Sequence, residues 1–366
     1  MPDILIRTDG NEKIATGHLM RCLSIARACA DQGKLVCFLV SDTQSESILR
    51  ERFASPSEFE IQCLHSDYQD MEKELPDLER IIQTDHASSK RILPKEDSWI
   101  LVDSYYVTAT YLETLKQWGQ VAYLDDLAAF PYPVDCIINY DVQENEKPDC
   151  YNMAARCLLG AAYTPLRAQF QNVSYTVQKK VEHILISTGG TDPFHAAERI
   201  LECLVKKKRA SSILYHIVTS RLNPCYNKLI ELCSKYPNIR IHENVQDMAG
   251  LMVQCDLAVS AGGTTLYELC AVGVPTISFA MADNQLSAVQ TFSSSNIIPY
   301  AGDIRVDMDG VLDSICSFLD EKENTYSKRL DSSNKMRSFV DGYGAVRIAE
   351  ALFAISDTST TTYSIL

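Results

Sequence analysis

Two pairs of adjacent glycines, Gly189 with Gly190 and Gly262 with Gly263, each stand directly after an apolar run and before helical sequence. Glycine lets backbone amides approach a ligand closely, and a helix N-terminus offers unpaired N–H groups and positive dipole charge to a pyrophosphate. Both loops are therefore expected at one sheet edge, with Thr264 opening the second helix. The pattern predicts a diphosphate site, and a tight strand-to-helix turn is the alternative for either pair alone.

Polar side chains near the second glycine pair extend this predicted site. Glu268 lies about one turn into the helix, where its carboxylate can accept hydrogen bonds from a ribose diol or merely stabilise the helix dipole. Asn284 and Gln285 follow the apolar run TISFA and are candidates to contact a nucleotide-sugar, or amides of a loop without function. The patterns GxxxxGK[ST] and GxGxxG are absent from both loops, which argues against kinase-type and dinucleotide binding.

A histidine in the first turn of the first predicted helix is the candidate general base. His18 ends the sequence ATGH, and a helix N-terminus disfavours the extra proton of an imidazolium, so a neutral base stays available near neutral pH. A histidine that only caps or packs at a helix start is the alternative. His195 follows a glycine loop and is a candidate phosphate contact. The remaining histidines show no supporting partner and are interpreted as structural: His65, His86, His183, His216 and His242.

Carboxylates recur where predicted strands end, at Asp9, at Asp103 and at the pair Asp125 and Asp126. Ligands of open α/β sheets bind at the carboxyl ends of the strands, so these groups can orient a sugar, a water or His18 itself. For each carboxylate alone, helix capping or turn formation is the alternative. Tyr105 and Tyr106, close to Asp103, are candidates to donate a hydroxyl to a sugar, or simply to pack.

The elements that must position these side chains alternate between strand and helix, which indicates two α/β halves with parallel sheets. A helix is predicted over 16–32, with Thr16 as its N-cap. Further helices are expected to begin near Asp192, Asn223, Asp247 and Thr264, and a last one to follow Val340. Strands are predicted at 3–9, 35–40, 99–102, 121–124, 136–138, 183–187, 212–218, 239–242, 257–260 and 276–279. The domains are expected at 1–165 and 183–355, with a polar linker at 166–182 and a flexible tail at 356–366.

The bulk properties fit a globular two-domain protein of the cytoplasm. The chain of 366 residues is too long for one typical α/β core, and its hydrophobic fraction of 46% is near the average for folded proteins. A net charge of −14 disfavours nucleic acid or anionic membranes as the main partner. The 13 cysteines are scattered and odd in number, so reduced core thiols are expected rather than disulfides or a metal site. Neither a signal peptide nor a membrane-spanning run is recognised.

Taken in order along the chain, several segments resemble the UDP-sugar hydrolases of the pseudaminic acid pathway. They are IRTDG, ATGHLMRCLSIA, DSYY, LDD, GAAYTPLRAQF, ISTGGTD, SAGGTTLYELCAVGVPTI and DNQ, and the match extends to about Glu350. The same segments are similar to a wider set of spore-coat polysaccharide proteins and, in the C-terminal half, to MurG-like glycosyltransferases. The resemblance implies a glycosyltransferase-B architecture, in which two Rossmann-like domains face a cleft.

The resemblance also implies a reaction, the hydrolysis of a UDP-linked diacetamido-trideoxy-altropyranose to UDP and the free sugar, which a condensing enzyme of the nonulosonic acid pathway then uses. Water attacks the anomeric carbon, and His18 activates it. The implied substrate contacts are Asp9, Gly17 and Tyr105 for the sugar, Gly189, Gly190, Gly262, Gly263 and Thr264 for the diphosphate, Glu268 for the ribose, and Asn284 and Gln285 for the junction between them. No cofactor or metal is expected, because helix ends and amides can stabilise the leaving UDP.

One departure and two rival functions accompany the resemblance. The chain has Ser104, Tyr105 and Tyr106 where some members carry a histidine-tyrosine-glycine run, which leaves the identity of the sugar open. A glycosyltransferase of the same architecture would use an acceptor hydroxyl instead of water, and the fold does not distinguish the two. A non-catalytic nucleotide-sugar-binding protein would bind UDP without turnover.

Overall fold

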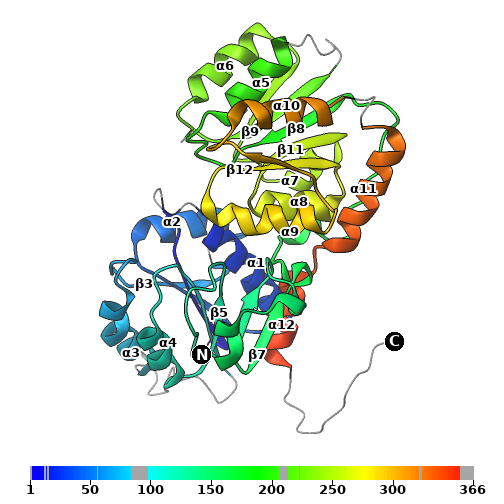
Figure 1. Cartoon of the computed structure of the whole chain (residues 1–366). Helices are drawn as coiled ribbons and strands as arrows, with labels where there is room; N and C mark the ends of the chain where they lie inside the picture. Colours follow the sequence, from blue (N-terminus) through cyan, green and yellow to red (C-terminus); the bar gives the residue numbers. More distant parts are fainter. Residues whose placement is uncertain are drawn as a thin grey trace.

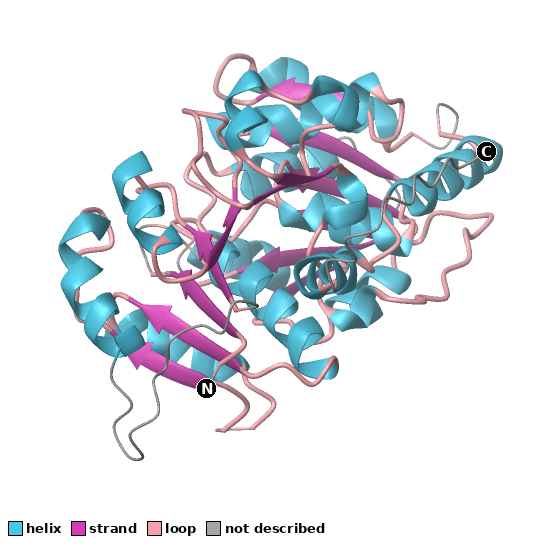
Figure 2. Ribbon diagram, turned by 90° about the horizontal axis from the view of Figure 1, so that it is seen from below, coloured by secondary structure: helices cyan, strands magenta, loops and turns pink. Residues whose placement is uncertain are grey.

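The computed structural model describes residues 2–354 except 12, 13, 15, 56, 84–97, 207–212, 222 and 321–323. Within this part the chain forms two α/β domains, drawn one above the other in Figure 1. Each domain is built on one parallel sheet, and Figure 2 shows helices on both sides of the strands. His86 and the predicted tail at 356–366 lie outside the described residues.

The N-terminal sheet has seven strands in the order β3-β2-β1-β4-β5-β6-β7. Its strands are β1 (Ile4–Thr8), β2 (Val36–Val40), β3 (Glu60–Cys63), β4 (Trp99–Asp103), β5 (Gln120–Leu124), β6 (Cys136–Asn139) and β7 (Arg156–Leu159). The α-helices between them are α1 (Gly17–Asp31), α2 (Thr43–Arg52), α3 (Leu75–Gln83) and α4 (Ala109–Lys116). The chain changes direction across the sheet between the neighbouring strands β1 and β4, which is where such sheets bind ligands.

The C-terminal sheet repeats this plan with six strands in the order β10-β9-β8-β11-β12-β13. Its strands are β8 (His183–Ser187), β9 (Leu214–Thr219), β10 (Ile239–Glu243), β11 (Leu257–Ala261), β12 (Thr276–Ala280) and β13 (Tyr300–Asp303). Its α-helices are α5 (Ala196–Lys206), α6 (Tyr226–Lys235), α7 (Met248–Val253), α8 (Thr264–Val272), α9 (Leu286–Ser294), α10 (Met308–Phe318) and α11 (Tyr326–Phe339). The corresponding change of direction lies between β8 and β11, and both glycine pairs follow these two strands.

The last helix of the described chain returns to the N-terminal domain. Helix α12 (Gly344–Phe353) packs against α1, and Figure 1 shows it, in red, beside β7 of the lower domain. Gly344 allows this approach, because a Cβ there would overlap the backbone of Thr164. The buried apolar side chains of α1, α8 and α12 belong to one continuous core, so the hydrophobic core crosses the junction between the domains.

The predicted strands are all present, with shifts of one or two residues at their ends. The strands that the sequence did not reveal, β3, β7 and β13, are edge strands with partly exposed side chains, which shortens their apolar pattern. The helix predicted at 16–32 is α1; Thr16 occupies its N-cap position, but its side chain makes no capping bond. All thirteen cysteines are free, as predicted. The division into domains at 166–182 stays a prediction.

Candidate functional site

A cavity of about 210 Å³ lies between the two domains at the carboxyl edges of their sheets, and we call it the interdomain cavity. The N-terminal domain contributes the start of α1 and the loops after β4, β5 and β6, and the C-terminal domain contributes the starts of α8 and α9. The cavity is lined by Ile14, Gly17, His18, Arg21, Tyr105, Asp126, Tyr140, Asp141, Gly262, Gly263, Thr264, Tyr267, Asn284 and Ala288. The structure thus joins the predicted base and the predicted diphosphate loop at one site.

His18 lies at the start of α1 and is held by Asp103, the last residue of the neighbouring strand β4. The His18 Nδ1 and Asp103 Oδ1 atoms are 2.6 Å apart, and both side chains are buried. Since a charged carboxylate can only accept a hydrogen bond, the proton of a neutral His18 sits on Nδ1. This leaves Nε2 as the nitrogen that can accept a proton, so the sequence-based idea that Asp103 orients His18 is supported by the geometry.

Arg21 keeps Asp103 in its charged form. Its Nε and Nη2 atoms donate to the two carboxylate oxygens at 2.7 and 2.6 Å, an arrangement of parallel bonds typical of strong arginine–carboxylate pairs. Burial by itself raises the pKa of Asp103, but the Arg21 guanidinium and His18 outweigh burial and hold this pKa well below its usual range. Arg21 lies three residues after His18 on the same face of α1, a spacing that the sequence contains but that gave no hint of its role.

Tyr105 forms the side of the interdomain cavity next to the base. Its ring packs edge-on against the His18 ring with centroids 4.6 Å apart, and its hydroxyl donates to Asp126 Oδ2 at 2.9 Å. Asn284, from the other domain, lies close to this hydroxyl and lines the same cavity. The neighbouring Asp125 has a different environment, because Tyr132, Tyr151 and two backbone amides donate to it, so it is a turn-forming residue.

A second, smaller cavity of about 10 Å³ adjoins His18 and contains Asp9 in its wall. Both carboxylate oxygens of Asp9 already accept hydrogen bonds, one from Arg7 at 2.5 Å and the other from the amide and hydroxyl of Ser41. Asp9 therefore holds the turn after β1 in place. The volume of the cavity is close to that needed by one water molecule, which requires roughly 10–15 Å³.

The turn between β11 and α8 offers a different set of amides from the one expected. The Gly262 amide donates to the Phe279 carbonyl at 2.9 Å and the Gly263 amide to the Ala261 carbonyl at 3.0 Å, so neither is directed at a ligand. The amides of Thr264 and Thr265, the first two residues of α8, have no backbone carbonyl partner, whereas the Leu266 amide already donates to the Gly263 carbonyl at 2.9 Å. The groups of this turn that remain able to bind an anion are therefore the amides at the helix N-terminus. The glycines provide room, since a Cβ at Gly262 would come within 2.5 Å of Val289.

The other glycine pair lies outside the interdomain cavity. Gly189 and Gly190 are exposed in the loop after β8, and Gly190 accepts a hydrogen bond from Ser220 at 2.6 Å. Glu268 also points elsewhere, because its Oε1 accepts from Arg167 at 2.8 Å and its side chain is buried. Gln285 bonds the amide of its own loop at Met281. The substrate contacts implied for these residues stay predictions.

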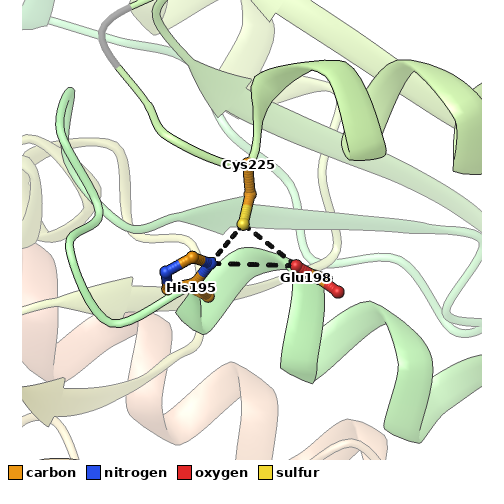
Figure 3. Close-up of side chains that lie close together, drawn as sticks. All are labelled: His195, Glu198 and Cys225. Atoms are coloured by element: carbon orange, nitrogen blue, oxygen red, sulfur yellow. Dashed lines mark hydrogen bonds and ion pairs between the residues drawn. The ribbon is translucent and has the colours of Figure 1, made fainter.

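His195 faces a cluster of its own, shown in Figure 3. Its Nδ1 contacts the sulfur of Cys225, which also donates to Glu198 Oε2 at 3.0 Å. These nitrogen, sulfur and oxygen atoms lie within 4.8 Å of one another, which is close enough to hold a metal ion. However, the ammonium of Lys228 already pairs with Glu198 and brings positive charge to the cluster. Glu198 is thus neutralised within the protein, and His195 does not line the interdomain cavity.

The structural interpretation of the other described histidines is consistent with the fold. His183, His216 and His242 come from the adjacent strands β8, β9 and β10 and form a stacked column, with ring nitrogens 2.9 Å apart at both steps. Burial, together with the two flanking histidines, lowers the pKa of His216 to about 4. The column lies outside the interdomain cavity.

Asp141 and Tyr267 line the interdomain cavity and connect the two domains, and the sequence suggested neither of them. The hydroxyl of Tyr267, on α8, donates to Asp141 Oδ1, and the rings of Tyr267 and Tyr140 pack edge-to-face with centroids 5.3 Å apart. Asp141 follows β6 and is buried. A carboxylate near a strand end is a signal that the sequence does contain, but its partner lies 126 residues away and on the other domain.

Comparison with known families gives a match in the domain that carries α8. Residues 184–340 match the glycosyltransferase family 28 C-terminal domain. The family 28 match extends from β8 to α11 and therefore includes the β11–α8 turn, Glu268 and Asn284. It does not include His18, Asp103 or α12, so the side of the interdomain cavity that carries His18 belongs to the unmatched part of the chain.

Two curated relatives match about half of the chain at low sequence identity. The spore coat polysaccharide biosynthesis protein SpsG of Bacillus subtilis is 27% identical over 195 residues, which are 53% of this chain and 57% of the relative. A Helicobacter pylori protein named pseudaminic acid cytidylyltransferase and UDP-2,4-diacetamido-2,4,6-trideoxy-beta-L-altropyranose hydrolase is 24% identical over 207 residues, 55% of this chain and 37% of the relative. The chain thus spans little more than half of the first relative and a smaller part of the second.

Solved structures confirm the architecture. MurG of Acinetobacter baumannii superposes with a TM-score of 0.66 at 14% identity, covering 95% of this chain and 98% of that one. Together with the two parallel sheets, this likeness confirms the predicted glycosyltransferase-B fold. Within the described residues, every helix is too short or too polar to cross a bilayer.

Proposed function

We propose that the chain hydrolyses a UDP-linked diacetamido-trideoxy sugar, with UDP-2,4-diacetamido-2,4,6-trideoxy-β-L-altropyranose as the first candidate, to UDP and the free sugar. The observation that carries the proposal is the position of the His18–Asp103 pair in a cavity whose opposite wall is the N-terminus of α8. A base faces an anion site across a space of about 210 Å³. The candidate sugar is the one in the name of the Helicobacter pylori relative.

The chemistry at the base begins with a water molecule beside His18. Asp103 fixes the ring and its tautomer, so Nε2 accepts the proton of the water as the oxygen attacks the anomeric carbon. The negative charge of Asp103 also stabilises the imidazolium that forms. The cavity of about 10 Å³ next to His18, with Tyr105 and Asp103 in its wall, is a suitable place for this water.

The leaving group is stabilised at the other side of the cavity. When the bond between the anomeric carbon and the phosphate oxygen breaks, negative charge grows on the diphosphate, and the free amides and dipole of the α8 N-terminus attract this charge. Asn284 and Tyr105 meet across the cavity and can contact the sugar between the two ends. These groups stabilise the charge without a metal ion, so activity in the presence of a chelator is expected.

A transferase is the second candidate, and the match to the glycosyltransferase family 28 C-terminal domain favours it. In this alternative an acceptor hydroxyl takes the place of the water beside His18. The matched region contains the nucleotide side of the site, which both reactions share, and leaves the side that selects the nucleophile unmatched.

UDP release without an acceptor tests the proposal. The purified protein is given the UDP-sugar with EDTA and without any acceptor, alongside His18→Asn, which keeps a polar side chain of similar size. We expect rapid release by the natural protein, and a loss of at least about 10²-fold in kcat with near-unchanged UDP affinity in the variant. Release that appears only after an acceptor is added would favour the transferase. Tight UDP binding without release under either condition would indicate a binding protein.

A further inference from the structure

Asp141 is a buried carboxyl group in the wall of the interdomain cavity, and the chemistry described so far leaves it without a task. It lies just after β6 and is 9% exposed. The hydroxyl of Tyr267 on α8 donates to its Oδ1, and the hydroxyl of Thr291 on α9 donates to its backbone carbonyl at 3.3 Å. The residue belongs to the N-terminal domain but is held by the C-terminal one.

These contacts place the carboxyl group beside the expected position of the diphosphate. Tyr267 lies three residues after Thr264, about one turn from the N-terminus of α8. Because Tyr267 reaches Asp141, the carboxyl group lies against the same helix turn that presents free amides to the cavity. His18 lines the cavity from α1, so the two ionisable groups approach from different elements.

The surroundings of Asp141 favour its protonated form. Its pKa is raised to about 7, mainly by burial and also by the neighbouring carboxyl group of Asp126. The hydrogen bond from Tyr267 and the charge of Arg21 oppose this shift. Arg21, however, divides its hydrogen bonds among Asp103, Asp126 and Tyr140. Asp126 has a different environment, because Arg21 and the Tyr105 hydroxyl both donate to it at 2.9 Å. Two carboxyl groups in different environments are typical of acid–base sites.

The proton of the neutral acid has one available position. Tyr267 donates to Oδ1, so the acidic proton is carried by Oδ2. Among the residues that the structure describes, Tyr267 is the only side chain that bonds the Asp141 carboxyl group. Oδ2 has no side-chain partner among the described residues, and Asp141 lines the interdomain cavity, where a ligand can accept the proton.

We propose that Asp141 is a further catalytic residue, the general acid that donates its Oδ2 proton to the phosphate oxygen leaving the anomeric carbon. The inference rests on the proposed hydrolysis. His18 Nε2 removes a proton from water, the water oxygen bonds to the anomeric carbon, and the electron pair of the broken carbon–oxygen bond passes to the phosphate oxygen. That oxygen receives the proton of Asp141. The second ionisation of a phosphate lies near pH 6, so proton transfer between it and Asp141 is nearly balanced.

The pH dependence of kcat tests this role. The acid works only while protonated, so kcat of the natural protein should fall as the pH rises above about 7. Asp141→Asn keeps an acceptor for Tyr267 but has no acidic proton. We expect its kcat to be lower by about 10²-fold or more and to show no such fall at alkaline pH. Thr291→Val, which removes only the bond to the Asp141 carbonyl, is the matched control and should keep the natural profile.

A purely structural Asp141 would give a different result. In that case Asp141→Asn and Thr291→Val would change stability or KM alike, and both would keep the alkaline fall in kcat. Retention of that fall in Asp141→Asn, or a kcat within a few-fold of the natural value, overturns the proposal.

Binding of UDP gives a second measurement that needs no turnover. A phosphate oxygen next to Oδ2 favours the protonated acid, so UDP binding at pH 8 should take up protons in the natural protein. Calorimetry in two buffers of different ionisation enthalpy measures this uptake, and Asp141→Asn should lack it. If the natural protein releases no UDP, the hydrolase proposal fails, and the proton uptake still decides the role of Asp141: equal uptake in both proteins contradicts it.

Discussion

At the scale of single residues, the base and its partner are 85 positions apart in the chain and meet because β1 and β4 are neighbours in the sheet. Residue type and position in the sequence singled out His18 and Asp103, since a histidine at a helix start and a carboxylate at a strand end are both recognisable patterns. The sequence did not reveal Arg21. Its role depends on reaching Asp103, Asp126 and Tyr140, and no local pattern encodes these three contacts.

Asp103→Asn tests the pair at this scale. The asparagine amide would no longer fix the proton of His18 on Nδ1, so Nε2 loses its role as the accepting nitrogen. We predict a fall in kcat of about 10²–10⁴-fold with a UDP dissociation constant within a few-fold of the natural value, because the nucleotide side lies on the other domain. Steady-state kinetics and calorimetry measure the two quantities. Near-natural kcat would mean that His18 acts without Asp103, and circular dichroism checks that the variant is folded.

Glu268 and the pair Gly189 and Gly190 have environments that their spacing in the sequence does not reveal. Glu268 stands at the position expected for a ribose contact, but Arg167 of the linker binds it in the ligand-free structure. Gly189 and Gly190 likewise follow a strand of the right sheet and still lie outside the interdomain cavity. In both cases a tertiary contact that joins distant segments decides the environment, and the local pattern contains no information about it.

At the scale of elements, the two glycines of the β11–α8 turn differ in their surroundings. Gly262 is packed against its neighbours, and Gly263 leaves open space at the cavity. A Cβ at Gly262 would come within 2.5 Å of Val289 and 3.0 Å of Gln285, whereas a Cβ at Gly263 would meet no atom within 4 Å. Both glycines have backbone conformations that alanine can adopt, so the difference between the two positions is one of space. Gly263 faces the cavity that the diphosphate is proposed to occupy.

Alanine at Gly262 should therefore affect mainly the stability of the fold, and alanine at Gly263 mainly the binding of UDP. Gly262→Ala is expected to lower the free energy of unfolding by about 1–3 kcal/mol, because the added methyl group overlaps its neighbours. Gly263→Ala should change this free energy by about 0.5 kcal/mol or less, but weaken UDP binding by about tenfold or more, since its methyl group enters the anion site. Urea denaturation and calorimetry provide the measurements. Unchanged UDP affinity in Gly263→Ala would place the diphosphate elsewhere.

The secondary structure elements were predicted well where they are buried. Strands such as β4 and β11 are covered on both faces and read as continuous apolar runs. The edge strands β3, β7 and β13 are only partly buried, so selection for apolar side chains is weaker and their pattern is lost. The start of α1 was predicted correctly, but the side chain of Thr16 makes no capping hydrogen bond.

At the scale of the whole molecule, the chain crosses between the domains twice. It passes through residues 166–182, the segment predicted as a linker, before β8 and returns with α12, which packs against α1. The linker sequence looked polar and aperiodic, yet Phe170 within it is fully buried and joins the core. Contacts across the cavity, from Asp141 to Tyr267 and from Tyr105 to Asn284, add to this connection. The relative position of the two sheets, and thus the cavity, depends on these contacts.

Gly344→Ala tests the return of the chain. A methyl group there overlaps the Thr164 backbone, so α12 must move away from the N-terminal domain. We predict a loss of about 1–3 kcal/mol in the free energy of unfolding and a weaker coupling between the two domains, seen as a broader or split thermal transition. Gly190→Ala is the control, because its Cβ would meet only the Ser220 hydroxyl at an ordinary 3.6 Å. Equal stability of the two variants would contradict the proposed role of the α12 contact.

The central claim is that the interdomain cavity directs water to the anomeric carbon of a UDP-sugar. Turnover of UDP-2,4-diacetamido-2,4,6-trideoxy-β-L-altropyranose in ¹⁸O-labelled water, without an acceptor and with EDTA, tests it most directly, with the label located by mass spectrometry. The account predicts that the heavy oxygen appears in the free sugar, bound to the anomeric carbon, and not in UDP. Label in the terminal phosphate of UDP, or no release of UDP until an acceptor is added, would contradict it.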